Sequence, residues 1–246
     1  MNTNPWQVQI KGWSSDLEHL TRHFTSSTMR VVKDESGSFL YESDSFKVCN
    51  ESSEVLELAN EELCVLSGVL KVVRESPEML RTGAVYKKNE SGGKDVFLCL
   101  SGIQVRAELG ELTITTSDSS GNIITKPTPP ARTITIMRLA TTDTSVAKVM
   151  RLIAAPDHKS WVGMYRIHEI IEADIGGEHK LQKRSWGSAK DLKRFKRSAN
   201  SVSVAGDSAR HGKEVEQQPT NPMSIYEAAA YLNYVLQSWL SSKEIS

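Results

Sequence analysis

The chain has 246 residues, enough to bury one large core or two small ones. Its 30 basic and 30 acidic residues give a formal charge of zero, which excludes a global field favouring nucleic acid or membrane. No apolar run is long enough to span a bilayer, and the first residues lack the basic and apolar regions of a secretory signal. Three widely spaced cysteines, Cys49, Cys64 and Cys99, favour neither a disulfide framework nor a zinc site. We therefore expect a cytoplasmic protein with no metal or other cofactor.

The first predicted elements are a strand, a short helix and a hairpin. In WQVQIKG, the residues Trp6, Val8 and Ile10 alternate with polar ones, as on a half-buried strand. SSDLEHLTRHF has helical periodicity, with Ser14 or Ser15 as its expected cap. MRVVKDESGSFLYES contains two β-rich runs around a turn, which indicates a hairpin.

A second helix and a series of strands complete the predicted N-terminal half. SSEVLELANEELCVLSGVLKVV is amphipathic, begins near Ser53 and is expected to end at Gly68 or approach a neighbour closely there. The strands expected next are GAVYKK, KDVFLCLSGIQVRAEL, ELTITTS and GNIITK, separated by turn-rich breaks. KPTPPAR is expected to be a loop, and TITIMRLA a final strand. Residues 1–140 are thus predicted to form a β-rich domain with two helices.

The pattern changes to helices after residue 140. TSVAKVMRLIAA follows Asp143 as a cap, and SWVGMYRIHEIIEAD is a second helix. SAKDLKRFKRSAN has Ser188 and Asp191 at capping-box spacing, and SIYEAAAYLNYVLQSWL has Ser224 and Glu227 at the same spacing. Residues 141–246 are therefore predicted to form a helical bundle, and the whole chain an α+β fold.

The bundle contains a cluster of basic residues in which Asp191 is the only acid. Its members are Lys180, Lys183, Arg184, Lys190, Lys193, Arg194, Lys196 and Arg197, and Arg210, His211 and Lys213 follow. Local clustering of this kind can bind a phosphate backbone even on a neutral chain. The alternative is a solvated helix face that pairs with acids elsewhere.

Aromatic residues and one histidine accompany this segment. Aromatic rings among cations can stack on unpaired bases. Phe195 follows Leu192 by three positions and is expected in the core, whereas the pattern does not settle the place of Trp186. His168, on an apolar helix, is expected to be a satisfied core group rather than part of a catalytic cleft.

Several segments resemble known proteins. The chain resembles an uncharacterised family of bacterial proteins. Three segments are similar to the C-terminal half of that family: SWVGMYRIHEIIEADIGG, SWGSAKDLKRFKRSAN and GDSARHGKEVEQQPTNPMSIYEAAAYLNYVLQSWL. Two others resemble its N-terminal half: DLEHLTRHF and VLELANEELCVLSGVLKVV. The helical half also resembles HEPN domains, in which an Arg and a His form a ribonuclease site, typically followed by Gly, as in Arg210-His211-Gly212. The resemblance implies a bacterial toxin or antiphage system and a homodimer through the last helix, which has Tyr231, Tyr234 and Trp239.

The spacing of the pair departs from the HEPN pattern. There the Arg precedes the His by about one helical turn, whereas Arg210 directly precedes His211, and adjacent residues do not share a helix face. Our first hypothesis is therefore a binding or adaptor protein. Its β-rich half would recognise a protein partner, and its basic segment would engage RNA or single-stranded DNA, with Arg210 facing outward.

The second hypothesis is a metal-independent ribonuclease. His211 would take the proton of a 2′-hydroxyl group, and Arg210 or another nearby Arg would stabilise the charge on the phosphorane.

Overall fold

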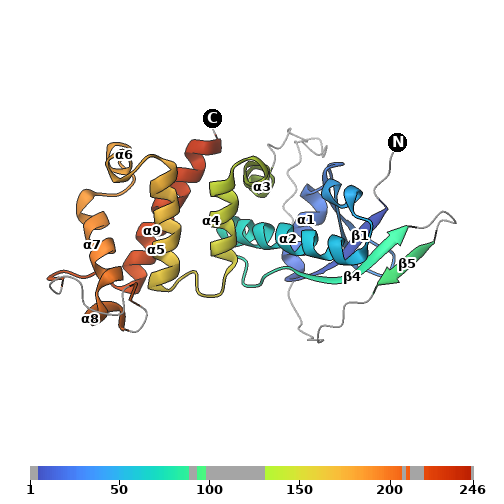
Figure 1. The fold of residues 1–246 in the computed structure, drawn as a ribbon, viewed down its shortest axis with the longest axis horizontal. Helices are drawn as coiled ribbons and strands as arrows, with labels where there is room; N and C mark the ends of the chain where they lie inside the picture. Colours follow the sequence, from blue (N-terminus) through green and yellow to red (C-terminus); the bar gives the residue numbers. More distant parts are fainter. Residues whose placement is uncertain (1–4, 89–92, 98–130, 207–208, 211–218, 245–246) are drawn as a thin grey trace, which may run out of the picture. The chain divides into compact units, whose positions relative to one another are not determined.

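The computed structural model describes residues 5–88, 93–97, 131–206, 209–210 and 219–244 (Figure 1). The chain divides into two compact units, Met1–Thr135 (unit 1) and Ile136–Ser246 (unit 2). The division falls inside helix α3, Arg132–Thr142. Unit 1 contains the sheet and unit 2 consists of helices, so the architecture is α+β, as predicted.

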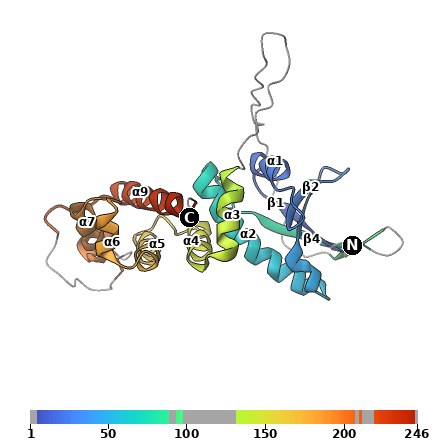
Figure 2. The ribbon, with the colours of Figure 1, turned by 90° about the horizontal axis from the view of Figure 1, so that it is seen from above.

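Unit 1 is built on a five-stranded antiparallel sheet in the order β2-β3-β1-β4-β5. The central strand β1 pairs with β4, and the two lie side by side in both views (Figure 1, Figure 2). Helix α2 packs against β4 and β1, and α1 contacts β2. The elements are β1 Trp6–Lys11, α1 Ser14–His23, β2 Met29–Lys33, β3 Phe39–Ser43, the 3-10 helix η1 Asp44–Val48, α2 Ser52–Arg74, β4 Arg81–Lys88 and β5 Lys94–Phe97.

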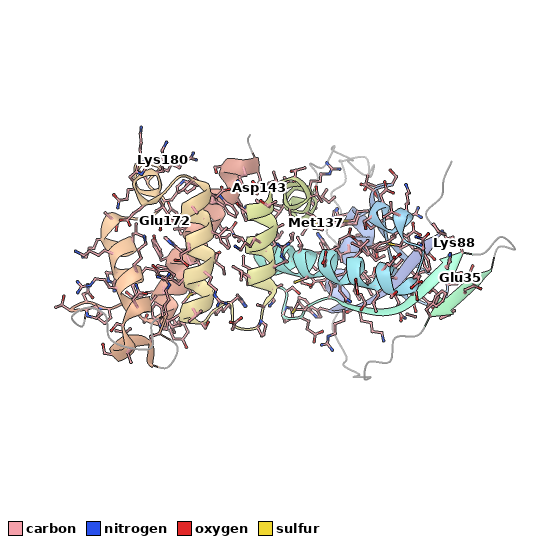
Figure 3. All side chains as sticks on the ribbon, viewed as in Figure 1. Glu35, Lys88, Met137, Asp143, Glu172 and Lys180 are labelled. Atoms are coloured by element: carbon pink, nitrogen blue, oxygen red, sulfur yellow. The ribbon has the colours of Figure 1, made fainter. Side chains whose placement is uncertain are left out.

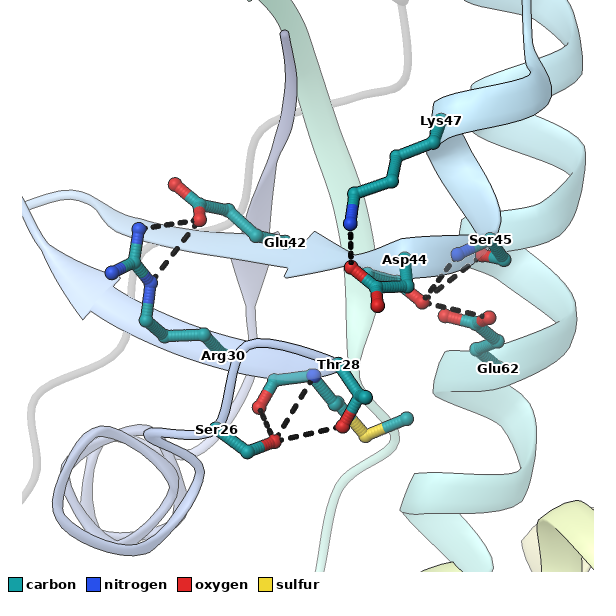
Figure 4. Close-up of polar contacts among 10 residues, drawn as sticks. Ser26, Thr28, Arg30, Glu42, Asp44, Ser45, Lys47 and Glu62 are labelled. Atoms are coloured by element: carbon teal, nitrogen blue, oxygen red, sulfur yellow. Dashed lines mark hydrogen bonds and ion pairs between the residues drawn. The ribbon is translucent and has the colours of Figure 1, made fainter. Parts of the chain in front are cut away.

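Polar contacts tie the strands of unit 1 to one another and to α2. Arg30 on β2 donates from Nε (3.1 Å) and Nη2 (2.6 Å) to Glu42 Oε2 on β3 (Figure 4). Glu62 on α2 accepts hydrogen bonds from the hydroxyl groups of Tyr41 (2.6 Å) and Ser43 (3.0 Å) on β3. Burial, and then the adjacent Glu62 carboxylate, raise the pKa of Tyr41 well above its ordinary value. The phenol therefore stays protonated and acts as a donor that fixes α2 on the sheet.

Two expected helix boundaries in unit 1 were wrong. Helix α1 begins after Trp13, which makes no side-chain cap bond, and Ser15 instead accepts a hydrogen bond from Arg74 at 3.0 Å. Helix α2 runs through the buried Gly68 to Arg74 and ends at Glu75, whose φ is 55°. Gly68 is buried and does not end the helix, so the expectation of termination is wrong, and the alternative of a close approach to a neighbour stays a prediction.

The predicted strand at TITIMRLA was also wrong, because this segment forms most of helix α3. Its first four residues, 133–136, are all β-branched, which is typical of strands. Thr133, Ile136 and Met137 are nevertheless spaced three and four residues apart, and all three are buried. The same residues thus satisfy a helical period, and burial of that face decides the structure. The expected strands ELTITTS and GNIITK, the KDVFLCLSGIQVRAEL run beyond Phe97, and KPTPPAR up to Pro130 lie outside the described residues.

Unit 2 is a helical bundle in which α9 lies against α5 and α7 (Figure 2). Its helices after α3 are α4 Thr144–Ala154, α5 Trp161–Asp174, α6 Glu178–Lys183, α7 Ala189–Asn200, α8 Val202–Ala205 and α9 Ile225–Glu244. The short helices α6 and α8 were not predicted. None of the helices in the described part of the chain is both long and apolar enough to cross a bilayer.

The predicted caps at Asp143 and Ser224 are confirmed. Asp143 accepts from the backbone N–H groups of Ser145 (2.9 Å) and Val146 (3.1 Å) at the start of α4 (Figure 3). Ser224 Oγ accepts from the N–H of Glu227 at 3.2 Å, and the Glu227 carboxylate accepts from the N–H of Ser224 at 2.8 Å. This reciprocal pair satisfies two backbone donors that α9 would otherwise leave unpaired.

Ser224→Ala should lower the free energy of unfolding of unit 2 by about 1 kcal/mol, because it removes the acceptor for the first turn of α9. The measurement is thermal and urea unfolding followed by circular dichroism. Ser241→Ala, at an exposed position near the other end of α9, is the matched control and should be close to neutral. Equal stability of the two variants would show that this cap does not stabilise α9.

Candidate nucleic-acid interface

The two units carry opposite net charges. Unit 1 contains 14 basic and 18 acidic residues, a net charge of −4, whereas unit 2 contains 16 basic and 12 acidic residues, a net charge of +4. Although the whole chain has no net charge, unit 2 is positively charged, and the basic segment lies in unit 2. A phosphate backbone is attracted by such a local excess.

The orientation of α7 is set by the burial of Phe195. Its ring is fully buried, with its centroid 6.0 Å from the ring of Tyr165, 5.2 Å from His168 and 5.3 Å from Tyr231. The expected core position of Phe195 is thus confirmed. Leu192, one turn earlier, is also fully buried, so α7 turns one apolar face into the bundle.

The opposite side of α7 and the end of α6 present cations to solvent. Lys183, Arg184, Lys190 and Lys193 are all exposed. Among the residues that the structure describes, none of these four has an acidic partner within ion-pair distance. No described carboxylate competes for these four cations, so they can meet phosphate groups directly.

Two other cations of α7 are engaged inside unit 2. Arg194 donates to the carbonyl oxygens of Asn221 and Pro222, both at 3.1 Å, and to Glu227 at 3.0 Å. The backbone N–H of Ser224, and then Arg194, lower the pKa of Glu227. Arg194 therefore fixes the segment that leads into α9, which is a structural role.

Lys196 has a similar structural role. Its Nζ lies 2.8 Å from Glu172 on α5 and 2.9 Å from Glu178 on α6. Burial opposes the charge of the ammonium group, but these two carboxylates raise the pKa of Lys196 overall. Lys196 therefore joins three helices. Arg197, one residue further, is half-buried.

Arg210 is exposed, as expected of a residue that faces outward, and its side chain is also anchored. Its backbone N–H donates to the carbonyl oxygen of Ala199 at 3.0 Å, and its Nη2 lies 2.8 Å from Glu169. Its guanidinium carbon lies 4.4 Å from the centroid of the Tyr165 ring, a cation–π contact. Arg210 thus attaches its loop to α5 and α7. His211 and Lys213 lie outside the described residues, so their predicted roles stay predictions.

His168 is a core group, as expected from its apolar helix. It is fully buried, and its Nε2 lies 3.3 Å from the hydroxyl of Tyr231. Its Nδ1 is 3.5 Å from a Glu172 oxygen without a hydrogen bond between them. Burial, and then the charge of Lys196, lower the pKa of His168 from its ordinary value of 6.5 to about 3. The imidazole is therefore neutral at pH 7.

The aromatic residues of α9 divide into two groups. Tyr231 and Trp239 are buried within unit 2, so these two residues do not offer the homodimer surface expected of them. Tyr234 is 55% exposed, and Tyr226, which the sequence reasoning overlooked, is 84% exposed. Tyr226 lies next to Ile225 and outside the apolar stripe of α9. This position in the sequence indicates that its side chain is exposed. Homodimerisation stays a prediction.

Metal chemistry has no evident centre in this part of the molecule. Within the described ranges, no three or more His, Cys, Asp or Glu side chains converge as metal ligands would.

No family model, curated protein or solved structure matches the chain. The resemblance to HEPN domains and to the uncharacterised bacterial family stays a prediction.

His168 should make unit 2 less stable in acid. Because its folded pKa of about 3 lies below the unfolded value of 6.5, the unfolded chain takes up a proton first as the pH falls. The contribution of the neutral imidazole is complete above pH 6.5 and is lost between pH 6.5 and 3, by roughly 1 kcal/mol per pH unit. Urea unfolding against pH measures it.

His168→Phe should flatten this pH dependence, because it removes the titrating group. His179→Gln, at an exposed position on α6, should leave it unchanged. The same acid sensitivity in wild type and His168→Phe would assign the effect to other groups.

Arg210→Ala should lower the free energy of unfolding of unit 2 by about 1 kcal/mol or less, because a partly exposed ion pair and one cation–π contact are lost. Arg210→Lys should recover only part of this stability, because a lysine ammonium group, unlike a planar guanidinium, cannot stack on a ring and donate hydrogen bonds at the same time. Arg166→Ala, an exposed change on α5, serves as the control in thermal unfolding. An Arg210→Ala variant as stable as this control would remove the anchoring role.

Proposed function

We propose that this protein binds nucleic acid, as RNA or single-stranded DNA, through the exposed cations of α6 and α7. The observation that carries the proposal is the set of four exposed basic side chains without acidic partners in the described part of unit 2: Lys183, Arg184, Lys190 and Lys193. Two other cations of the same segment, Arg194 and Lys196, form ion pairs with carboxylates inside unit 2. Some cations of the segment thus stabilise the bundle, and others face solvent.

Binding is favoured over cleavage by the state of Arg210. A cation that stabilises a phosphorane has to reach the reacting phosphate. The guanidinium of Arg210 is engaged by Glu169 and by the face of Tyr165. This arrangement supports an anchor for the loop rather than a catalytic group, and binding is therefore our first choice. Recognition of a protein partner by unit 1 stays a separate prediction.

The test is fluorescence anisotropy with a labelled single-stranded RNA at low salt. Lys190→Glu/Lys193→Glu should weaken binding by at least about tenfold, because it removes two phosphate contacts and adds repulsion. Lys148→Glu/Lys159→Glu makes the same charge change at exposed positions of unit 2 outside the basic segment. This control should bind almost as well as wild type.

Salt provides a second measurement on the same samples. Four phosphate contacts to a single strand predict a logarithmic salt slope of about −3, and the Lys190/Lys193 variant should show a shallower one. Absence of RNA binding at low salt would refute the proposal. Equal losses in the two double variants would show that charge acts through the unit as a whole and not through α7.

A further inference from the structure

The turn between α6 and α7 is a tightly built structure. The N–H of Ser185 donates to Gln182 (3.0 Å) and that of Trp186 to Leu181 (3.3 Å), the two bonds of a Schellman motif that ends α6. Ser185 takes the left-handed position at φ 56°, which a residue other than glycine adopts at a cost. The direction of the chain, and with it the position of Trp186, is therefore fixed.

This turn is seated directly on α9. Gly187 has a φ of 98°, and a Cβ atom at this position would lie 2.6 Å from the ring of Tyr231. Only glycine allows so close an approach. The hydroxyl of Tyr234, one turn along α9 from the buried Tyr231, lies 3.5 Å from the carbonyl oxygen of Ser185. The exposed ring of Tyr234 thus lies beside the turn.

Cations and aromatic rings meet at this place. The guanidinium carbon of Arg184 lies 5.0 Å from the ring centroid of Trp186, which is half-buried. Lys183 is exposed next to it in sequence. Tyr234 adds a second ring beside the turn, and Tyr226 is a third, about 12 Å further along α9 at 1.5 Å per residue.

The exposed side of α9 around these tyrosines carries one acidic residue, Glu227, whose carboxylate is paired with Arg194 at 3.0 Å. Ala230 and Asn233 are exposed between them, and Gln237 follows half-buried. Exposed aromatic rings beside cations that no described carboxylate pairs match a nucleic-acid strand, whose bases stack on rings and whose phosphates attract Lys and Arg. A duplex keeps its base faces stacked inside and has none to offer.

We propose that the turn at residues 184–187 and the exposed side of α9 form a base-stacking platform that selects single-stranded over double-stranded nucleic acid. Tyr234 and Trp186 stack on unpaired bases, and Lys183 and Arg184 bind the adjoining phosphates. This inference rests on the proposed nucleic-acid binding and deepens it by naming the class of ligand.

The experiment compares a labelled single-stranded 12-nucleotide RNA with the duplex of the same sequence, in anisotropy at one salt concentration. Wild type should prefer the single strand. Tyr234→Ala should weaken binding of the single strand by about tenfold and leave the duplex unchanged, because one stacking contact is lost. Tyr234→Phe retains the ring and should bind as wild type does. Ser241→Ala, at an exposed position two turns beyond Tyr234 and outside the platform, should also bind normally.

The outcomes separate this inference from the proposed function. No binding of either RNA by wild type overturns both. Two outcomes overturn the platform and leave the proposed function standing. In the first, Lys190→Glu/Lys193→Glu weakens binding of the single strand but Tyr234→Ala does not. In the second, wild type binds the single strand and the duplex with equal affinity. Sedimentation of the same variants adds one more readout. A dimer that Tyr234→Ala dissociates with no change in RNA affinity would assign this surface to a second copy of the chain and overturn the platform.

Discussion

Burial of the Phe195 ring among Tyr165, His168 and Tyr231 sets the rotation of α7 about its axis. Two residues along an α-helix turn the side chain by about 200°, so Lys193, two positions before the buried Phe195, lies on the opposite side. Lys193 is exposed, and Lys190 joins it one turn earlier, whereas Arg197, two positions after Phe195, is half-buried. The charged surface of unit 2 is a consequence of aromatic packing beneath it.

The same packing explains why the basic residues of α7 are not equivalent. Arg194 and Lys196 lie at the edges of the buried face, where carboxylates of neighbouring helices reach them. An ammonium or guanidinium group at such a half-buried position needs these partners to offset its desolvation. Glu172 also lies 3.5 Å from Nδ1 of His168, so one acidic residue of α5 contacts both the structural cation Lys196 and the edge of the aromatic core.

The sequence predicted the fold well where local signals agreed with burial. The hairpin at residues 29–43, the caps at Asp143 and Ser224 and the buried face of α9 required only periodicity and side-chain capping. It failed at α3, because Thr133 and Ile136 fit both a strand and a helix, and only tertiary burial distinguishes the two. It missed α6, whose six residues begin after two glycines and show too little periodicity to be recognised.

The candidate site was only partly predictable. Composition located the basic segment, but the separation of Lys190 and Lys193 from Lys196 depends on acids from α5 and α6 that are distant in sequence. The anchoring of Arg210 by Glu169 and Tyr165 is equally non-local. The 184–187 turn packs on α9 because Gly187 approaches the ring of Tyr231 closely. These two residues are distant in sequence, so the sequence pattern does not reveal the contact.

The central claim is that aromatic packing in unit 2 presents a surface for a nucleic-acid strand on α6, α7 and α9. Ultraviolet crosslinking of the full chain to a single-stranded RNA, followed by mass spectrometric mapping of the crosslinked residues, tests it most directly. The account predicts crosslinks at Trp186 and Tyr234 and in peptides that include Lys190 and Lys193. Crosslinks confined to unit 1, or their complete absence under conditions in which the RNA is bound, would contradict it.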